Sequence, residues 1–149
     1  MLSRCNTIIF VGILGAAALG TAPAAASAQP VDVSAKSCGF EFSRTLPMVL
    51  TPQITARGLA QCDAPPEEHT LTLALQYDNN GRWETACSKT DSSIPPGAPG
   101  FATYEVSAAC YAGRWRMAVS ILGRLQGTPF AFSDYSTVRE VPSSQCPSR

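Results

Sequence analysis

The chemically most versatile side chain in this 149-residue chain is its single histidine, His69, which directly follows Glu67 and Glu68. An imidazole beside a carboxylate can act as a general acid and base, or it can hold a metal ion. The cluster also follows two prolines and opens an alternating segment, where charged side chains are common because the backbone there lies outside the sheet. We therefore interpret it as a solvated strand entry and expect no catalytic residue and no metal site.

Other catalytic and metal-binding patterns fail on spacing. The chain has no GxSxG nucleophile elbow, and a catalytic cysteine would have only His69 as a partner. Asp78-Asn79-Asn80-Gly81 has the composition of the start of a calcium loop, but the closing glutamate is missing at the required distance. These four residues are typical of a tight turn. The sequence thus predicts a protein that is not an enzyme and uses no cofactor, with a small extracellular hydrolase as one alternative.

The balance of charge excludes two classes of partner. The chain carries 11 Lys and Arg against 11 Asp and Glu, and only two of the basic residues are lysines. Binding to nucleic acid or to a membrane surface requires a concentrated positive field. We therefore expect neither nucleic acid nor a membrane as the partner.

The first 28 residues have the features of a Sec-type signal peptide. Arg4 is followed by the apolar run Ile8–Leu19, which is shorter than the roughly 20 residues of a membrane span. Ala26-Ser27-Ala28 is an A-x-A cleavage pattern that places the mature start at Gln29. We expect a secreted, extracellular protein that is not inserted in the membrane after cleavage.

Five cysteines remain after this cleavage, and an oxidising compartment favours disulfides over metal ligation. The two favoured bonds are Cys38–Cys62 and Cys87–Cys110, and the alternative to the second is Cys110–Cys146. An odd number leaves one thiol over, which is Cys146 or, under the alternative pairing, Cys87. The expected state is a monomer, and a dimer linked through this thiol is the alternative.

Segments that alternate between apolar and polar residues indicate strands throughout the mature chain. They are Cys38–Arg44, Gln53–Cys62 with a bulge at Gly58, His69–Tyr77, Arg82–Lys89, Thr103–Cys110, Arg114–Leu125 and Phe130–Val141. No helical periodicity interrupts them. The expected fold is a single antiparallel β-sandwich of about seven strands, immunoglobulin-like and stapled by disulfides, with a small Greek-key barrel as the alternative. The expected domain limits are 1–28 for the leader, 29–37 for a lead-in, 38–141 for the sandwich and 142–149 for a tail.

The aromatic and arginine residues follow the same alternation. Trp83 and Cys87 are placed on one side of their strand, and Trp115 is expected to plug the edge of the sandwich. This spacing favours a core position over an exposed aromatic strip for Trp83, Trp115, Tyr77, Tyr104 and Tyr111. We expect Arg82, Arg114 and Arg116 on the solvated outer face.

The segment Asp91–Gly100 is the best candidate for a binding element, although it is also a plausible simple connector. Its prolines stiffen it, so that presenting it to a partner would lose little entropy. The candidate binding residues are Ile94, Pro95, Pro96, Gly97, Pro99 and Gly100. The sequence therefore predicts a secreted module that binds an unknown protein or glycan, or alternatively an inhibitor that inserts Ser92–Gly100 into the cleft of a protease or hydrolase.

Three short patterns carry a resemblance to a family. They are the A-x-A leader, the Trp-x-x-x-Cys segment from Trp83 to Cys87, and the Cys-x-x-Gly-x-Trp-Arg segment from Cys110 to Arg116. Together they resemble the small uncharacterised secreted immunoglobulin-like β-sandwich proteins of actinomycete bacteria. The resemblance implies an exported β-sandwich and carries no activity with it.

Overall fold

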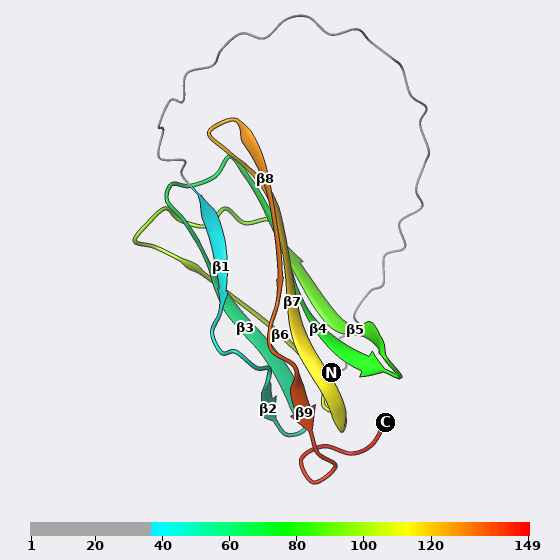
Figure 1. Ribbon diagram of the computed structural model, residues 1–149. Coiled ribbons are helices and arrows are strands. Elements are labelled where there is room, and N and C mark those ends of the chain that lie inside the picture. Colours follow the sequence, from blue (N-terminus) through cyan, green and yellow to red (C-terminus); the bar gives the residue numbers. More distant parts are fainter. Residues whose placement is uncertain (1–36) are drawn as a thin grey trace, which may run out of the picture. The chain divides into compact units, whose positions relative to one another are not determined.

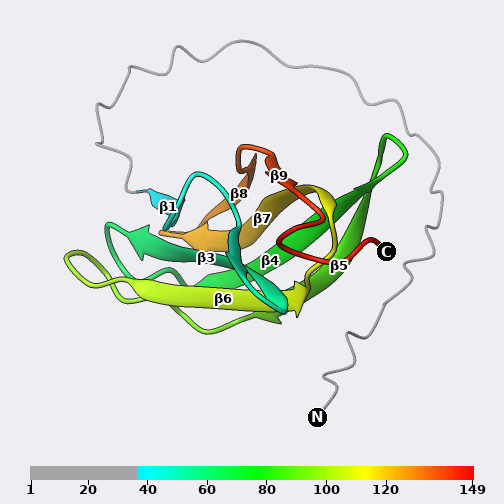
Figure 2. The same cartoon turned by 90° about the horizontal axis from the view of Figure 1, so that it is seen from below.

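The computed structural model describes residues 37–149, and the expected leader 1–28 and nearly all of the expected lead-in 29–37 lie outside them. This part of the chain forms nine strands and no helix. The strands make two antiparallel sheets that pack face to face (Figures 1 and 2). The predicted all-β sandwich is confirmed. No helix in residues 37–149 has the length and apolar character needed to cross a membrane.

The first sheet has four strands and is organised around β3 (Gln53–Cys62), whose bounds agree with the sequence prediction. β6 (Ala102–Ala109) pairs along one side of β3. β1 (Cys38–Phe42) and β2 (Met48–Leu50) follow one another along the other side. β2 escaped prediction because three residues are too few to show an alternation.

The second sheet has five strands. β4 (Glu68–Asn79) and β7 (Gly113–Leu125) form its centre, and β5 (Arg82–Asp91) pairs with the outer side of β4. β8 (Thr128–Tyr135) and the short β9 (Arg139–Val141) both pair with β7. The segment predicted as one last strand is therefore two strands that pair with different parts of β7.

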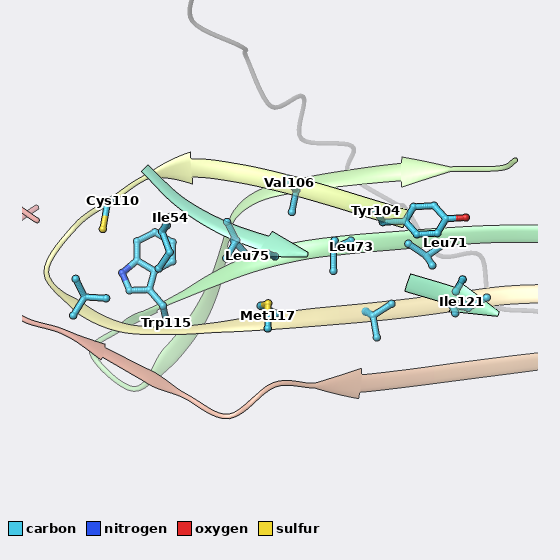
Figure 3. Packing of buried hydrophobic residues seen from close by; sticks show 14 of the residues in the cluster. Ile54, Leu71, Leu73, Leu75, Tyr104, Val106, Cys110, Trp115, Met117 and Ile121 are labelled. Carbon is cyan, nitrogen blue, oxygen red and sulfur yellow. The ribbon is translucent and has the colours of Figure 1, made fainter. Parts of the chain in front are cut away.

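The core lies between the two sheets and is built from the inward positions of the alternating strands. Figure 3 shows Trp115 and Cys110 at one end of this core and Tyr104 beside Leu71 towards the other. The largest fully buried side chains include Trp115, Ile54, Leu71, Leu73, Leu75, Met117 and Ile121.

Gly58 does not form the expected bulge, because the pairing of β3 with β1 and β6 continues through it without a shift. The glycine is required for another reason. A Cβ atom at this position would lie 2.2 Å from the ring of Phe40, so only glycine leaves room for that ring.

The actual bulge lies in β5. Leu75 pairs with Cys87 and Gln76 pairs with Thr85, so Ala86 has no partner in β4. The extra residue reverses the facing of the strand on its two sides. Cys87 therefore packs against the core, whereas Trp83 turns to the outer face, and the prediction that the two share one side is wrong.

The turn between β4 and β5 has the chemistry that its sequence indicates. Asn80 and Gly81 have φ values of 53° and 86°, and the Asp78 carboxylate accepts a hydrogen bond of 2.7 Å from the Gly81 amide. Positive φ at both central residues matches the twist of a two-residue hairpin. The interpretation of Asp78–Gly81 as a turn is confirmed.

One disulfide bond lies near each end of the sandwich. Cys38 is bonded to Cys62, as predicted from the antiparallel pairing of their strands. Cys110 is bonded to Cys146, so the alternative pairing is correct and Cys87–Cys110 is wrong. Cys110 directly follows the end of β6, far from the loop that joins β5 to β6, whereas Cys87 lies in the middle of β5. Cys87 is itself disulfide-bonded, so the expectation that one of the cysteines in residues 37–149 stays unpaired is wrong. Disulfides indicate an oxidising compartment.

Candidate functional site

The longest connection between strands in residues 37–149 is Ser92–Phe101, which joins β5 to β6 and is called the Pro/Gly loop here. Its base is fixed to the body of the sandwich. Pro95 is fully buried, and the Ala98 amide donates a hydrogen bond of 2.8 Å to the carbonyl oxygen of Cys62. A Cβ atom on Gly97 would lie 2.8 Å from Pro65, so the backbone approaches this proline closely. The loop thus rests directly on a cysteine of the Cys38–Cys62 bond.

The outer part of the Pro/Gly loop is apolar. Ile94 is 45% exposed and Phe101 is 57% exposed, and no residue of the loop is charged. The structure separates the residues proposed from the sequence into two groups. Ile94, Pro96 and Pro99 are exposed, whereas Pro95, Gly97 and Gly100 belong to the base or are partly covered. Phe101 was not among the predicted binding residues, because its sequence position suggests the first apolar residue of the following strand.

Glu67 and Glu68 both contact the end of β7 and the turn that follows it, whereas His69 is buried, so the three residues form no common site. The Glu67 carboxylate accepts the amide hydrogen bonds of Gln126 and Gly127, at 2.9 and 3.3 Å, in the turn between β7 and β8. Glu68 pairs with Arg124 at 3.7 Å. His69 is only 2% exposed, so its interpretation as part of a solvated strand entry is wrong. Residues 37–149 contain no group of three or more side chains arranged to hold a metal ion.

His69 and Tyr104 lie in the core near the Pro/Gly loop with their polar atoms unpaired. No hydrogen bond of normal geometry reaches either ring nitrogen of His69 or the Tyr104 hydroxyl, although the Ser93 backbone lies close enough to the imidazole to affect its pKa. Burial lowers the pKa of His69, and the Ser93 backbone and the charge of Asp91 oppose this effect only in part. Burial, with the charge of Asp91, also raises the pKa of Tyr104. Both groups are therefore uncharged at neutral pH, and each buried unpaired polar group costs about 1–3 kcal/mol.

The outer face of the second sheet carries a stacked group of side chains. The Arg116 guanidinium lies 4.3 Å from the ring centre of Trp83 and 4.0 Å from that of Tyr135, and its Nε donates to Gln76 at 2.7 Å. Arg114 pairs with Asp78 on the same face. The prediction of an outer face is correct for these arginines, but both are engaged in contacts and are not simply solvated.

The burial of the other aromatic residues depends on which face of its strand each one occupies. Trp115 and Tyr104 are buried, and Tyr77 and Tyr111 are half-buried against the core. The Trp115 indole donates a hydrogen bond of 2.8 Å to the carbonyl oxygen of Tyr111. This is the corner contact expected of an aromatic residue at the sandwich edge. Trp83 alone among the five lies on the outer face, because the bulge at Ala86 turns it outwards.

Comparisons with known proteins give no family assignment. No family model matches the chain, and no curated protein matches it. Among solved structures, the sporulation control protein Spo0M of Bacillus subtilis is similar with 13% identity and a TM-score of 0.38 over 74% of this chain. The chain spans 50% of that structure. A protein from Archaeoglobus fulgidus is similar with 13% identity and a TM-score of 0.27, over 70% of this chain and 98% of that one.

Proposed function

We propose that this protein is a non-enzymatic binding module that inserts the apolar tip of its Pro/Gly loop into a groove of a partner protein. One observation carries the proposal: Ile94 and Phe101 are held out in solvent by a loop whose base is fixed at Pro95 and Cys62. A fixed loop loses little conformational entropy on binding, and buried aromatic and aliphatic anchors supply most of the affinity of an interface.

The contact between the Pro/Gly loop and a disulfide bond also supports the proposal that the protein is exported. The loop rests on the Cys38–Cys62 bond, which is stable in an oxidising compartment. We infer that residues 1–28 form a signal peptide cleaved after Ala28 and that the mature protein acts outside the cell, as the secreted actinomycete proteins it resembles are expected to do. N-terminal sequencing of the secreted protein tests this inference, and any start other than Gln29 contradicts it.

The partner is tested with matched substitutions of exposed apolar residues. Ile94→Ser with Phe101→Ser removes the two large exposed apolar side chains of the loop, whereas Leu122→Ser changes a side chain that is 60% exposed on the outer face of β7. Purified wild type should retain a protein from the culture medium or cell wall of the producing organism. The Leu122 variant should retain it equally, and the loop variant should bind the purified partner at least about tenfold more weakly. Equal binding by the loop variant would refute the proposal.

The disulfide behind the loop favours one particular kind of partner, a secreted protease or hydrolase. A loop that stays rigid in a cleft acts as an inhibitor, because it resists the distortion that cleavage requires. Incubation with a panel of secreted proteases measures residual activity and loop cleavage. Rapid cleavage within Ser92–Phe101 without inhibition would exclude this second candidate and leave the binding module intact.

A further inference from the structure

A pocket of about 210 Å³ opens between β5 and β6, at the end of the sandwich opposite the Pro/Gly loop. The space exists because its walls carry small side chains. Ala86 is the extra residue of the bulge, and Ala108 and Ala109 face it from the end of β6. Tyr77 forms the aromatic wall with the fully buried Trp115 packed against it, and Glu84 contributes a carboxylate.

The aromatic rings of the pocket are fixed by their own polar atoms. Tyr77 and Trp115 meet edge to face with ring centres 5.1 Å apart. The Tyr77 hydroxyl donates to the carbonyl oxygen of Ala112 at 3.1 Å, and the Trp115 indole donates to that of Tyr111. Because hydrogen bonds hold both rings in place, little conformational entropy would be lost in ordering them when a ligand binds.

The carboxylate of Glu84 is also positioned. Its Oε1 accepts a hydrogen bond of 2.9 Å from the Asn79 amide, which leaves Oε2 facing the pocket region and Arg149. Aromatic faces combined with a carboxylate recognise organic cations, since the ring quadrupole and the negative charge both attract them.

A cation of the chain itself is already at this site. The Arg149 guanidinium lies 5.6 Å from the ring centre of Tyr77 and 3.8 Å from Glu84 Oε2. It is brought there by the Cys110–Cys146 bond and by the Ala112 amide, which donates to the carbonyl oxygen of Pro147 at 2.8 Å. The end of the chain lies beside β5 in both views of the fold (Figures 1 and 2). The Arg149 side chain is 57% exposed and its contacts are long, so it can be displaced.

We propose that this pocket binds the guanidinium group of an arginine side chain from a partner peptide, and that Arg149 occupies the site until the partner replaces it. A planar guanidinium can lie against Tyr77 while its N–H groups reach Glu84, which a spherical ammonium does less well. The site is separate from the Pro/Gly loop, so this proposal does not depend on the function proposed above.

The experiment titrates N-acetylarginine amide into the full-length mature protein carrying Trp83→Phe. The chain has two tryptophans, and this background leaves Trp115, which lines the pocket, as the only indole reporter. Adding Arg149→Ala removes the internal competitor, whose tether gives it an effective concentration in the millimolar range. Binding should then tighten by about three- to tenfold.

Matched variants identify the recognition groups. In the Arg149→Ala background, Glu84→Gln should weaken binding by about tenfold, because a charge-assisted contact is lost. Ala108→Leu should abolish binding, because Ala108 lines the pocket from the inner face of β6 and a leucine side chain there fills it. Glu41→Gln, a change of an exposed carboxylate on the other sheet, should have no effect.

Two ligand controls complete the test. N-acetylcitrulline amide has the shape of the arginine ligand without its charge, and N-acetyllysine amide has the charge without the plane. Both should bind clearly more weakly than the arginine ligand. Equal binding of citrulline, equal binding of lysine, no effect of Glu84→Gln, or no binding by the Arg149→Ala protein would each overturn the proposal.

Discussion

The two ends of the sandwich are each closed by a disulfide bond, but they treat their buried polar groups differently. At the end with Cys110–Cys146, the Trp115 indole and the Tyr77 hydroxyl both donate hydrogen bonds to backbone carbonyls. At the end with Cys38–Cys62, the His69 nitrogens and the Tyr104 hydroxyl are buried without partners. Arg139 Nε, on β9 opposite Trp115, is also buried without a partner. The end with Cys110–Cys146 is named the satisfied end because the polar atoms of its aromatic rings are paired, and the other is named the loop end.

The difference predicts unequal local stability at the two ends of the same fold. Unpaired buried groups lower the free energy of unfolding, and elements of low local stability are those that binding most often uses. The loop end is also the end that carries the Pro/Gly loop with its exposed Ile94 and Phe101. We therefore expect the loop end to open locally more readily than the satisfied end.

The largest expected effect is at the satisfied end. Trp115→Ala should lower the free energy of unfolding by about 3–5 kcal/mol, because a fully buried indole leaves a cavity. Urea denaturation followed by far-UV circular dichroism measures the change. Trp83→Ala is the matched control: it removes an indole from the outer face and should cost about 1 kcal/mol, from its contact with Arg116. Equal losses of unfolding free energy in the two variants would contradict the core position of Trp115.

Removing each disulfide should next show which end each one stabilises. Cys110 and Cys146 are 36 positions apart in the sequence, and Cys38 and Cys62 are 24 positions apart. Replacing both cysteines of either bond with serine should lower the free energy of unfolding by about 3–4 kcal/mol. Hydrogen exchange distinguishes them. Loss of Cys38–Cys62 should accelerate exchange at the Ala98 amide, which bonds to Cys62, and loss of Cys110–Cys146 should accelerate it at Ala112, which bonds to Pro147. Equal acceleration at both amides in both variants would show that the ends are not independent.

Much of the fold was predictable because the inward positions of its central strands alternate strictly. The spacing of two residues in β4 and β7 identifies Leu71, Leu73 and Met117 as core residues, and all three are buried. The same spacing placed His69, two residues before Leu71, on the inner face. The spacing therefore indicated that His69 is buried, but the two charged residues before it favoured an exposed position.

Other features had no local signal. The bulge at Ala86 contains no glycine or turn residue, so nothing in the sequence indicated that Trp83 and Cys87 face opposite sides. The pairing of Cys110 depends on where β6 ends, and the pocket at Glu84 is formed by residues of β4, β5, β6 and β7 that are far apart in the sequence. Such features follow from the three-dimensional register of distant segments, which periodicity does not specify.

The loop end should be sensitive to acid. Burial lowers the pKa of His69 in the folded protein, so the unfolded chain binds more protons as the pH falls below about 6.5. The stability contributed by neutral His69 is complete above that pH and is lost as the pH falls towards the folded pKa, with a slope of up to about 1.4 kcal/mol per pH unit. Asp91 lies nearby and limits the loss, since its charge favours the protonated imidazole.

His69 is the only histidine in the chain, so its proton titration by NMR is unambiguous. Unfolding free energies measured in urea from pH 8 to pH 5 should fall for wild type. The protection factors of the Pro/Gly loop amides, which correct for the intrinsic pH dependence of exchange, should fall over the same interval. His69→Leu should remove this pH dependence, and an unchanged pH profile in that variant would assign the acid sensitivity to another group.

The smallest expected effects have opposite signs at the two ends. Tyr104→Phe removes a buried hydroxyl that has no partner, so it should raise the free energy of unfolding by about 1 kcal/mol. Tyr77→Phe removes a hydroxyl that donates to Ala112, so it should lower the free energy by about 1 kcal/mol. The two substitutions are chemically identical, and urea denaturation at one pH compares them directly. If both variants lose stability, Tyr104 has a hydrogen-bond partner in solution, and the contrast between the ends is confined to His69.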